Sequence, residues 1–419
     1  MESIRIQGGI PLGGAIAVHG AKNSALPLLA ATLLCHGTAV LEHCPRLSDV
    51  GVALEILRHL GCRTQQQEHT VTVDASTPTR AEIPDRLMRQ MRSSIVFLGA
   101  ILARCGEAEL TYPGGCELGP RPIDLHLAAL RRLGADIREE HGYIRCQTAG
   151  GLRGAEITLA FPSVGATENV LLAACTARGQ TVLHHAAQEP EIDDLCGFLN
   201  ACGARISAPS PGVLQIEGVE ALRGAVYPVM PDRIEAATYL AAAAATGGDI
   251  TLQRCCPAHI APVLALLEEG GCTVSAREDT VRLIAPTRLR ELGSVRTMPY
   301  PGFPTDAGAP LLAAACTAAG TSVFVESIFE NRYKYVDELT RMGARIRVDG
   351  RVAVVEGVPR LQGAAVECTD LRGGAALVIA GLAATGETVV TGLQHLDRGY
   401  EELEKTCTAL GAQLCRSGE

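Results

Sequence analysis

Gly134-Ala135-Asp136-Ile137 has counterparts at five other places in this chain of 419 residues. Each copy begins with Gly, continues with two further residues and ends with a residue that favours β structure. The other five are Gly61-Cys62-Arg63-Thr64, Gly203-Ala204-Arg205-Ile206, Gly271-Cys272-Thr273-Val274, Gly343-Ala344-Arg345-Ile346 and Gly411-Ala412-Gln413-Leu414. Successive glycines are 73, 69, 68, 72 and 68 residues apart. A period of this length indicates one supersecondary unit repeated six times.

An amphipathic helix precedes each of these glycines, and a short strand follows. In His126–Leu133 a leucine recurs at every third position, which is a helical spacing. Gly134 then suits the end of that helix, where the backbone commonly takes positive φ. Val352–Glu356 is typical of the β-branched segments that follow.

A second helix is expected near the middle of each repeat. These segments are rich in Ala and apolar on nearly all sides, which is typical of buried helices. They are Ser24–Leu34, Ser93–Leu102, Ala166–Cys175, Ile234–Ala245, Ala307–Ala318 and Gly373–Ala384. Helices inside and sheets outside would reverse the usual layering of α/β proteins.

Composition excludes several classes of protein. The net charge of −9 argues against a general nucleic-acid binder and against a membrane-surface protein. The 16 cysteines form no C-x-x-C pair and show no zinc-ligand spacing, so we expect a reduced, cytoplasmic protein without a metal site. The start of the chain lacks a secretory signal, and the longest apolar run, 236–246, is too short for membrane insertion. Trp is absent and aromatic residues make up 3%, so the cores must be aliphatic.

The segments before the six buried helices differ from one another, and several carry a charge. Helix N-termini attract anions because their first N–H groups are unpaired and the helix dipole is positive there. Six such ends facing one cleft would form a strong anion site, and Lys22, Arg92 and Arg372 would add full charges to it.

Each charged residue also has a purely structural interpretation. An Arg in a loop is most often a solvated surface group. Asp306, taken alone, suits an N-cap in front of the helix predicted at Ala307–Ala318. Because the chain contains 15 other cysteines, Cys116 taken alone suits a structural role. It differs from them in lying in a Gly-rich loop near Arg121, where a thiol can be exposed and its pKa lowered.

Seven phrases together resemble the enolpyruvyl transferase family, and within it the cell-wall branch, the UDP-N-acetylglucosamine 1-carboxyvinyltransferases. The resemblance runs from Arg5 to Gly418. The phrases are Gly20-Ala21-Lys22-Asn23, Met91-Arg92-Ser93-Ser94, Pro113-Gly114-Gly115-Cys116, Arg121-Pro122-Ile123-Asp124-Leu125-His126, Ser163-Val164-Gly165-Ala166-Thr167-Glu168-Asn169, Pro304-Thr305-Asp306 and Asp397-Arg398-Gly399-Tyr400.

The resemblance implies an α/β fold of two inside-out, barrel-like domains. Each would contain three repeats with buried helices and outer sheets. Residues 20–229 would form the first domain, and residues 1–19 with 230–419 the second, completed by the N-terminal strand. The active site would lie in the cleft between the domains.

The chemistry that the resemblance implies is transfer of the enolpyruvyl group of phosphoenolpyruvate to the 3-hydroxyl of UDP-N-acetylglucosamine, with release of phosphate. This reaction begins peptidoglycan synthesis, and hence serves cell-wall biogenesis, cell shape and cell division. It proceeds by addition and elimination through a tetrahedral intermediate. It requires no cofactor and no metal, and its partners are the two small-molecule substrates rather than nucleic acid. The sequence does not indicate the oligomeric state.

The implied site residues follow by position. The phosphate of phosphoenolpyruvate would be held by Lys22, Arg121 and Arg398, with Asn23 beside them, and its carboxylate by Arg332 and Arg372. UDP-N-acetylglucosamine would contact Asn23, Arg92, Arg121, Pro122, Ile123, Asp124, Leu125, Phe161, Ser163, Val164, Gly165, Asp306 and Ile328. Lys22 and Arg398 would also act in catalysis.

Two of these residues would exchange protons. Cys116 resembles the loop cysteine credited with protonating phosphoenolpyruvate and alkylated by fosfomycin. Asp306 would be the base, or a relay, at the 3-hydroxyl. A proton donor and a nucleophilic thiolate require a thiol pKa near the working pH.

One departure from the family pattern and three alternatives remain. Gly308 stands where relatives tend to carry Gln, and Gly weakens a helix by about 1 kcal/mol relative to Ala. The alternatives are an enolpyruvyl transferase with another acceptor, a non-catalytic paralogue that binds UDP-sugars, and a purely structural repeat protein. The Cys116 loop and the phrases expected to bind uridine argue against another acceptor. Cys116, Asp306, Lys22 and the Arg positions argue against a pure binder, which needs neither an acid nor a base. A purely structural protein would leave the charged segments before the buried helices unexplained.

Overall fold

The computed structural model describes residues 2–114 and 123–418. Two compact units appear, and each is described by itself. The first unit contains the described residues of 20–230, and the second unit contains residues 2–19 together with 231–418.

Six buried helices occur where the sequence predicts them. They are α1 (Lys22–Thr32), α4 (Phe97–Cys105) preceded by the 3₁₀ helix η1 (Arg92–Val96), α6 (Val164–Ala174), α8 (Arg233–Thr246), α10 (Thr305–Ala315) and α12 (Leu371–Ala383). With η1 counted as the start of the second segment, each begins one or two residues before its predicted start. The charged residues Lys22, Arg92, Asp306 and Arg372 therefore lie in first turns rather than in the preceding loops. The N–H groups of a first helical turn have no intrahelical partner, so polar residues and Gly are common in that turn and resemble a loop in the sequence.

Six amphipathic helices end just before the repeated glycines, as predicted. They are α2 (Ser48–His59), α5 (Asp124–Arg132), α7 (Pro190–Ala201), α9 (Ala261–Glu269), α11 (Val336–Arg341) and α14 (Leu403–Ala409). The six glycines have φ between 87° and 103°, a conformation that disfavours side chains with a Cβ. The remaining helices of the described residues are α3 (Asp85–Gln90), η2 (Pro257–Ile260) and α13 (Leu393–Leu396).

The strands of the described residues form six sheets, one for each repeat. In the first unit the strand orders are β13 (Val226–Pro228)–β3 (Thr38–Glu42)–β5 (Thr70–Asp74)–β4 (Arg63–Gln67), β6 (Glu107–Thr111)–β8 (Tyr143–Thr148)–β7 (Ala135–Glu140), and β9 (Glu156–Thr158)–β10 (Gln180–His184)–β12 (Val213–Glu217)–β11 (Arg205–Ser210). In the second unit they are β2 (Gly13–Ala17)–β14 (Asp249–Gln253)–β16 (Thr280–Ile284)–β15 (Thr273–Arg277), β17 (Ser294–Arg296)–β18 (Thr321–Val325)–β20 (Val352–Glu356)–β19 (Arg345–Asp349), and β21 (Ala365–Glu367)–β22 (Glu387–Thr391)–β1 (Ser3–Gln7)–β23 (Gln413–Ser417).

The last sheet joins the two ends of the chain. In the other five repeats the outermost two strands form a hairpin from consecutive sequence. In the sixth, β1 takes the inner position and pairs antiparallel with both β22 and β23, so that Ser3 lies opposite Ser417. The N-terminal strand therefore completes the last sheet of the second unit.

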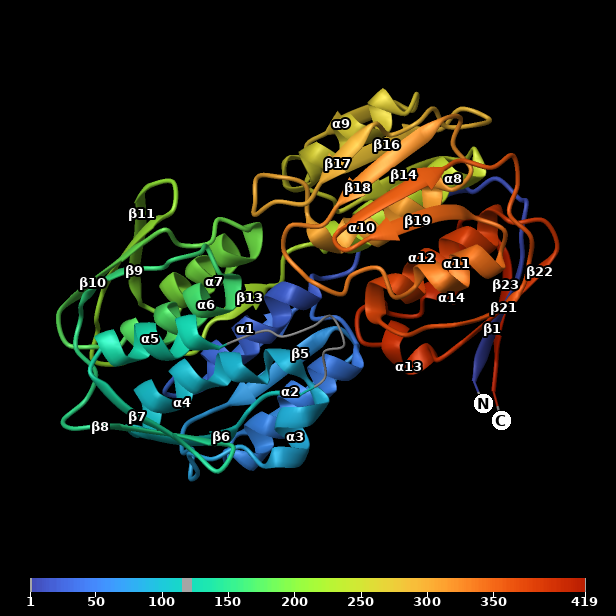
Figure 1. The fold of residues 1–419 in the computed structure, drawn as a ribbon. Coiled ribbons are helices and arrows are strands. Elements are labelled where there is room, and N and C mark those ends of the chain that lie inside the picture. Colours follow the sequence, from blue (N-terminus) through green and yellow to red (C-terminus); the bar gives the residue numbers. More distant parts are fainter. Residues whose placement is uncertain (1, 115–122, 419) are drawn as a thin grey trace. The chain divides into compact units, whose positions relative to one another are not determined.

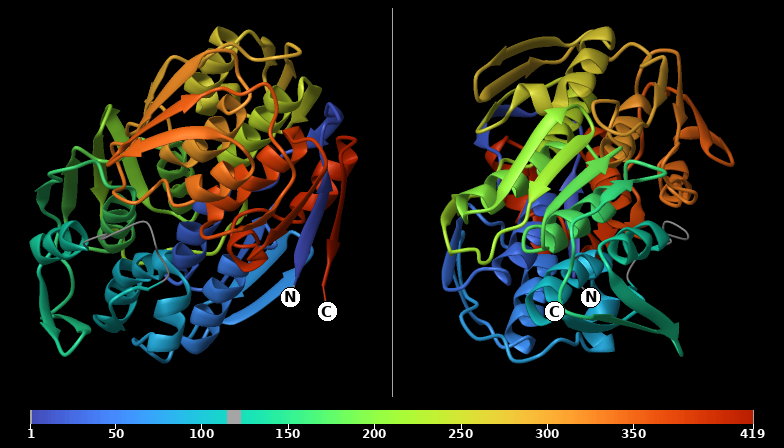
Figure 2. Two further views of the ribbon diagram at one scale, coloured as in Figure 1. Left: turned by 45° about the vertical axis from the view of Figure 1, so that its right-hand side comes forward. Right: turned by 90° about the vertical axis from the view of Figure 1, so that its left-hand side faces the viewer.

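The buried helices lie inside each unit and the sheets outside. Figures 1 and 2 show this layering, with α1, α4 and α6 enclosed by strands in the first unit and α8, α10 and α12 in the second. Strands such as β5 alternate buried and less buried residues, because only one face of each sheet meets the helices. The two cores are almost entirely aliphatic, as the composition predicts.

Short contacts fix the segments where the chain leaves each unit. In the first unit, Ala21 N donates to Met230 O at 2.7 Å. In the second, Asp232 N donates to His19 O at 2.8 Å, and the Glu235 carboxylate accepts from the backbone N–H of His19 and lies 2.8 Å from its Nδ1. The hydrogen bond to Glu235 raises the pKa of His19.

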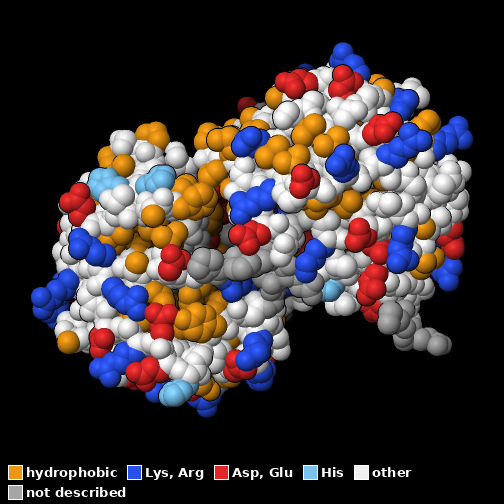
Figure 3. Space-filling model, in the orientation of Figure 1, with side chains coloured by type: hydrophobic (Ala, Val, Ile, Leu, Met, Phe, Trp, Pro, Cys, Tyr) orange, Lys and Arg blue, Asp and Glu red, His pale blue; other side chains and the backbone are white. Residues whose placement is uncertain are grey.

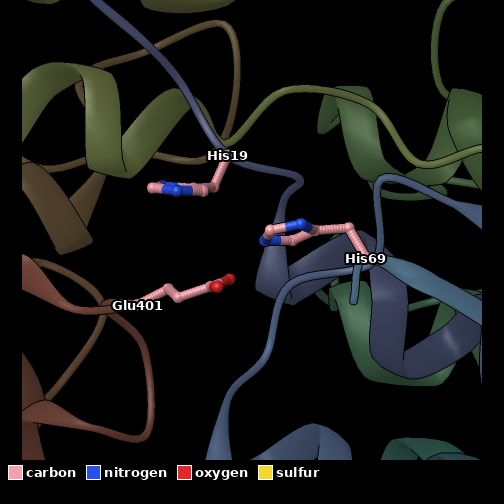
Figure 4. A group of neighbouring side chains, drawn as sticks. All are labelled: His19, His69 and Glu401. Atoms are coloured by element: carbon pink, nitrogen blue, oxygen red, sulfur yellow. The ribbon is translucent and has the colours of Figure 1, made fainter. Parts of the chain in front are cut away.

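Figure 4 draws His19 with Glu401, another residue of the second unit. The third side chain drawn, His69, belongs to the first unit, and we assign no ligand to this group.

The exposed side chains carry both signs of charge. On the face drawn in Figure 3, positive and negative side chains are interspersed over the described residues. Across residues 2–114 and 123–418, no helix combines the length and the apolar character that a membrane crossing requires.

Candidate active site

Asp306 lies inside helix α10 rather than in front of it. The helix begins at Thr305 with Pro304 at the N-cap position, so the structural interpretation of Asp306 as an N-cap is wrong. Because its carboxylate does not cap the helix, it is available for other partners. Gly308, further along the same helix, has room around it: an added Cβ would meet only Thr297, at 4.0 Å.

Two buried arginines hold the Asp306 carboxylate, one on each oxygen. Arg332 Nη2 donates to Oδ1 at 2.7 Å, and Arg372 Nη2 donates to Oδ2 at 3.0 Å. The two arginine side chains are 4% and 3% exposed, and that of Asp306 is 26% exposed. Within the described residues, Arg332 Nε and Arg372 Nε and Nη1 have no hydrogen-bond partner. Buried donors left in this way favour binding of an anion.

The position of Arg372 is set by its own helix and by an aromatic ring. Asp370 caps α12 by accepting from Arg372 N at 3.0 Å and from Gly373 N at 2.9 Å. The Arg372 guanidinium lies over the Tyr400 ring, 5.3 Å from its centroid, and the Tyr400 hydroxyl is 2.8 Å from Thr238 Oγ1 in α8. Arg372, in the first turn of α12, is therefore linked directly to Asp306 in the first turn of α10 and, through Tyr400, to Thr238 of α8.

Arg398 precedes Tyr400 by two residues, in the turn after α13. It is half-buried. Its neighbour Asp397 forms a bidentate ion pair with Arg416 of β23, at 2.7 and 2.8 Å. This pair anchors the turn that carries Arg398 to the last strand of the sheet.

Glu326 links the start of α10 to the segment that contains Ile328. Its buried carboxylate accepts from Thr297 and Thr305 hydroxyls at 2.9 and 2.8 Å. It also accepts from Ile328 N at 2.7 Å and Phe329 N at 3.0 Å. The structure thus gathers Asp306, Ile328, Arg332 and Arg372 in the second unit.

In the first unit, Lys22 is the first residue of α1 and is buried. Its Nζ lies 2.8 Å from Asp49 Oδ2 of α2, and both side chains are at most 9% exposed. Asn23 follows in the same turn and is half-buried. The side chain of Ser24 donates a short hydrogen bond to Asp194 of α7, which fixes the start of α1.

A second group of predicted residues surrounds the start of α6. Ser163 caps this helix, and Val164 and Gly165 form its half-buried first turn. Phe161 is 45% exposed. Arg92, the first residue of η1, donates to Pro113 O at 2.9 Å.

The segment at the start of α5 lies close to a cavity. Ile123 is buried, Asp124 is exposed and Leu125 is half-buried. A cavity of about 370 Å³ is lined by Leu125 and by residues of α5 and β9, including Arg132 and Leu159.

Two buried residues of this group belong to phrases that carry the resemblance but were not assigned to the site from the sequence. Asn169 of α6 is fully buried and hydrogen-bonded to three other segments. His126 is 8% exposed, and burial together with the charge of Arg92 lowers its pKa to about 4. The available signal was an Asn in the middle of a helix predicted to be buried, because a buried amide requires partners.

Three predicted residues, Cys116, Arg121 and Pro122, lie outside the described residues. Their proposed roles rest on the resemblance of their sequence alone.

Comparison with known proteins assigns the family. The model of the EPSP synthase (3-phosphoshikimate 1-carboxyvinyltransferase) family matches residues 6–407. A "UDP-N-acetylglucosamine 1-carboxyvinyltransferase 2" from Caldanaerobacter subterraneus is 50% identical over 99% of this chain and 100% of its own length. A "UDP-N-acetylglucosamine 1-carboxyvinyltransferase 1" from Symbiobacterium thermophilum is 49% identical over 99% of this chain and 95% of its own. The chain belongs to the enolpyruvyl transferase family.

Solved structures of this family have the same fold. The enolpyruvyl transferase NikO from Streptomyces tendae superimposes with a TM-score of 0.88 at 28% identity, with 99% of both chains covered. An EPSP synthase from Acinetobacter baumannii gives a TM-score of 0.77 at 20% identity, covering 100% of both chains. The enolpyruvyl transferase fold predicted from the sequence is thereby confirmed.

Proposed function

We propose that this protein is a UDP-N-acetylglucosamine 1-carboxyvinyltransferase. It transfers the enolpyruvyl group of phosphoenolpyruvate to the 3-hydroxyl of UDP-N-acetylglucosamine and releases phosphate. Relatives of that name are about half identical to it over nearly their whole length. The observation that carries the proposal is the pair of buried arginines around Asp306, which retain unused donors.

The reaction requires three proton movements and the breaking of one bond between carbon and a phosphate oxygen. The methylene carbon of phosphoenolpyruvate gains a proton, and the sugar hydroxyl loses one as its oxygen attacks the neighbouring carbon. In the second step the methyl group loses a proton and the bond to the phosphate oxygen breaks. Every species on this path is anionic, so fixed cations stabilise it.

Arg332 and Arg372 bind the substrate carboxylate in this proposal. A carboxylate is planar and accepts paired hydrogen bonds from a guanidinium fork. Both arginines also contact Asp306, which places a carboxylate beside the bound substrate. Asp306 acts there as base or relay for the 3-hydroxyl.

The remaining roles follow the family pattern. Lys22, Arg121 and Arg398 bind the phosphate of phosphoenolpyruvate, with Asn23 beside them. Cys116 delivers the proton and is the target of fosfomycin.

UDP-N-acetylglucosamine is proposed to bind two single residues and two stretches of the first unit, and two residues of the second. The residues are Asn23, Arg92, the segment 121–125, Phe161, Ser163, Val164 and Gly165 in the first unit, and Asp306 and Ile328 in the second. We place the protein in the cytoplasm, at the start of peptidoglycan synthesis.

The choice of acceptor is tested by mass spectrometry of the product. We expect the mass of UDP-N-acetylglucosamine plus an enolpyruvyl group when phosphoenolpyruvate and this acceptor are supplied. Shikimate 3-phosphate, the acceptor in the name of the family model, should give no product. A product with shikimate 3-phosphate alone would contradict the proposal and favour another acceptor.

A further inference from the structure

Both polar atoms of the Asn169 side-chain amide have hydrogen-bond partners. Its Oδ1 accepts from Gly99 N at 2.6 Å, and its Nδ2 lies 3.1 Å from Ile95 O and 3.3 Å from Gly165 O. A carbonyl oxygen cannot donate and a backbone N–H cannot accept, so these partners permit only one orientation of the amide. Nδ2 is therefore a donor.

The orientation of Asn169 determines the tautomer of His126. Asn169 Nδ2 lies 2.9 Å from His126 Nδ1. Nδ2 carries two hydrogens, and the two shorter contacts, to His126 Nδ1 and Ile95 O, take them in preference to Gly165 O. Nδ1 therefore accepts, and the proton of a neutral imidazole must be on Nε2. Protonation of Nδ1 would set two donors against each other, and rotating the amide would break its bonds to Gly99 and Ile95. Asn169 therefore opposes the charged form of His126.

The Nε2–H group of His126 has no hydrogen-bond partner within the described part of the chain. The edge of the ring that carries Nε2 lies against the first turn of α6: a Cβ added to Gly165 would lie 2.8 Å from Cε1, 3.3 Å from Nε2 and 4.0 Å from Glu168 Oε2. Any side chain at position 165 would thus fill the space in front of this donor. The side chain of His126 itself is more than nine-tenths buried.

The charges around His126 favour an anion at this place. The positive charge of the Arg92 guanidinium helps to lower the pKa of the His126 imidazole. The N-terminus of α6 adds unpaired N–H groups and the positive end of the helix dipole. Asp124 at the start of α5 opposes this effect and is exposed to solvent. Glu168, one turn along α6, is buried, and burial followed by the charges of Glu191 and Glu189 raises its pKa to about 8.

We propose that Asn169 is a positioning residue that locks His126 as the neutral Nε2–H tautomer, so that His126 donates a hydrogen bond to the diphosphate of the sugar nucleotide. This inference rests on the proposed function, since it takes a nucleoside diphosphate as the ligand. A neutral donor binds the diphosphate without taking up a proton. Asn169 contacts only protein groups in this arrangement.

The tautomer is measured directly on the unmodified protein by ¹⁵N NMR of labelled histidine. We expect His126, identified by the signal that disappears in His126→Gln, to show a protonated Nε2 and an unprotonated Nδ1 from pH 5.5 to 8. In Asn169→Asp, the carboxylate accepts from Nδ1, so His126 should become an imidazolium at neutral pH. The matched control is Asn200→Asp, because Asn200 also bonds backbone groups, those of Ile206, but on the exposed side of α7.

The ligand is tested by calorimetry with UDP and with uridine. His126→Leu should weaken UDP binding by about ten- to a hundredfold, the range for a hydrogen bond to a charged group, and leave uridine unchanged. His126→Gln keeps a neutral donor and should restore much of the loss.

Four results would overturn the inference. Two concern the NMR measurement: an Nδ1-protonated or charged His126 in the unmodified protein, and an unaltered His126 signal in folded Asn169→Asp. The other two concern His126→Leu: an equal loss of affinity for uridine and UDP, and an unchanged affinity for UDP. Failure of the unmodified protein to bind UDP would instead reject the proposed function, while the NMR result would still decide the tautomer.

Discussion

At the scale of single residues, the chemistry depends on charges held in place by other charges. Asp306 accepts from two buried guanidinium groups, and Lys22 pairs with the buried Asp49. Breaking one side of such a pair leaves the other charge buried and unpaired, which costs about 3–5 kcal/mol when both are fully buried. We therefore expect these residues to contribute to folding as well as to the proposed reaction.

Asp306→Asn tests the role of the carboxylate. The substitution keeps the shape of the side chain and removes its charge and its basicity. We expect kcat/KM to fall by about 10²–10⁴-fold, the usual contribution of a general base. We also expect a lower melting temperature, because Arg332 and Arg372 lose their counter-charge.

Asp249→Asn is the matched control for this substitution. Asp249 also forms a two-point contact with an arginine, Arg282, at 2.8 and 3.0 Å, but both side chains are about half exposed. Activity should not change and stability should shift by less than about 1 kcal/mol. Full activity in Asp306→Asn would show that the carboxylate is not the base.

Residue types and order in the sequence predict many of these residues but not their partners. The phrase containing Asp306 resembles its family, yet the sequence does not state that Arg332 and Arg372 meet on the same carboxylate. The two arginines are 40 residues apart and converge only through the packing of α10 and α12. Asp49 and Asn169 were missed for the same reason, since each acts through a contact distant in sequence.

At the scale of elements, the repeated glycine ends each amphipathic helix and starts a strand. Two of these glycines in the first unit differ in their surroundings. Gly134 has φ of 95° and nothing within 4 Å of an added Cβ. Gly61 has φ of 101°, and an added Cβ would lie 2.6 Å from Thr79 Oγ1 and 2.8 Å from Thr79 N.

Substitution of each glycine by alanine distinguishes two causes of destabilisation: backbone strain alone at position 134, and strain together with a steric clash at position 61. Gly134→Ala should cost about 1–2 kcal/mol, the penalty of a left-handed backbone with a Cβ. Gly61→Ala should cost a further 1–3 kcal/mol or so, because the backbone of Thr79 cannot move aside freely. Urea unfolding of both variants measures the difference. Equal midpoints, or a less stable Gly134→Ala, would contradict this explanation.

Elements are predicted better than their boundaries. The apolar Ala-rich segments identify all six buried helices, because no amphipathic pattern competes with them. Their starts are misplaced by one or two residues, since Lys22, Arg233 or Asp306 in a first turn is indistinguishable from a loop residue by composition. The sequence pattern alone does not specify which residues of β1 lie opposite which residues of β23.

At the scale of the whole molecule, six copies of one motif form two units of three. Each unit encloses three buried helices, and the chain closes on itself where β1 enters the last sheet. The spacing of the repeated glycines, 68 to 73 residues, is enough to predict the six repeats from the sequence alone. The residues proposed to act in the reaction are those that differ between copies, such as Arg372 at one helix start and Gly165 at another.

The central claim is that the chain transfers an enolpyruvyl group to UDP-N-acetylglucosamine. The most direct measurement is release of phosphate from phosphoenolpyruvate with and without this acceptor, before and after treatment with fosfomycin. We predict release that depends on the sugar nucleotide and is abolished by the drug, which would also support Cys116 as the reactive thiol. No release in the presence of both substrates would contradict the claim, and release that survives the drug would remove Cys116 from the mechanism.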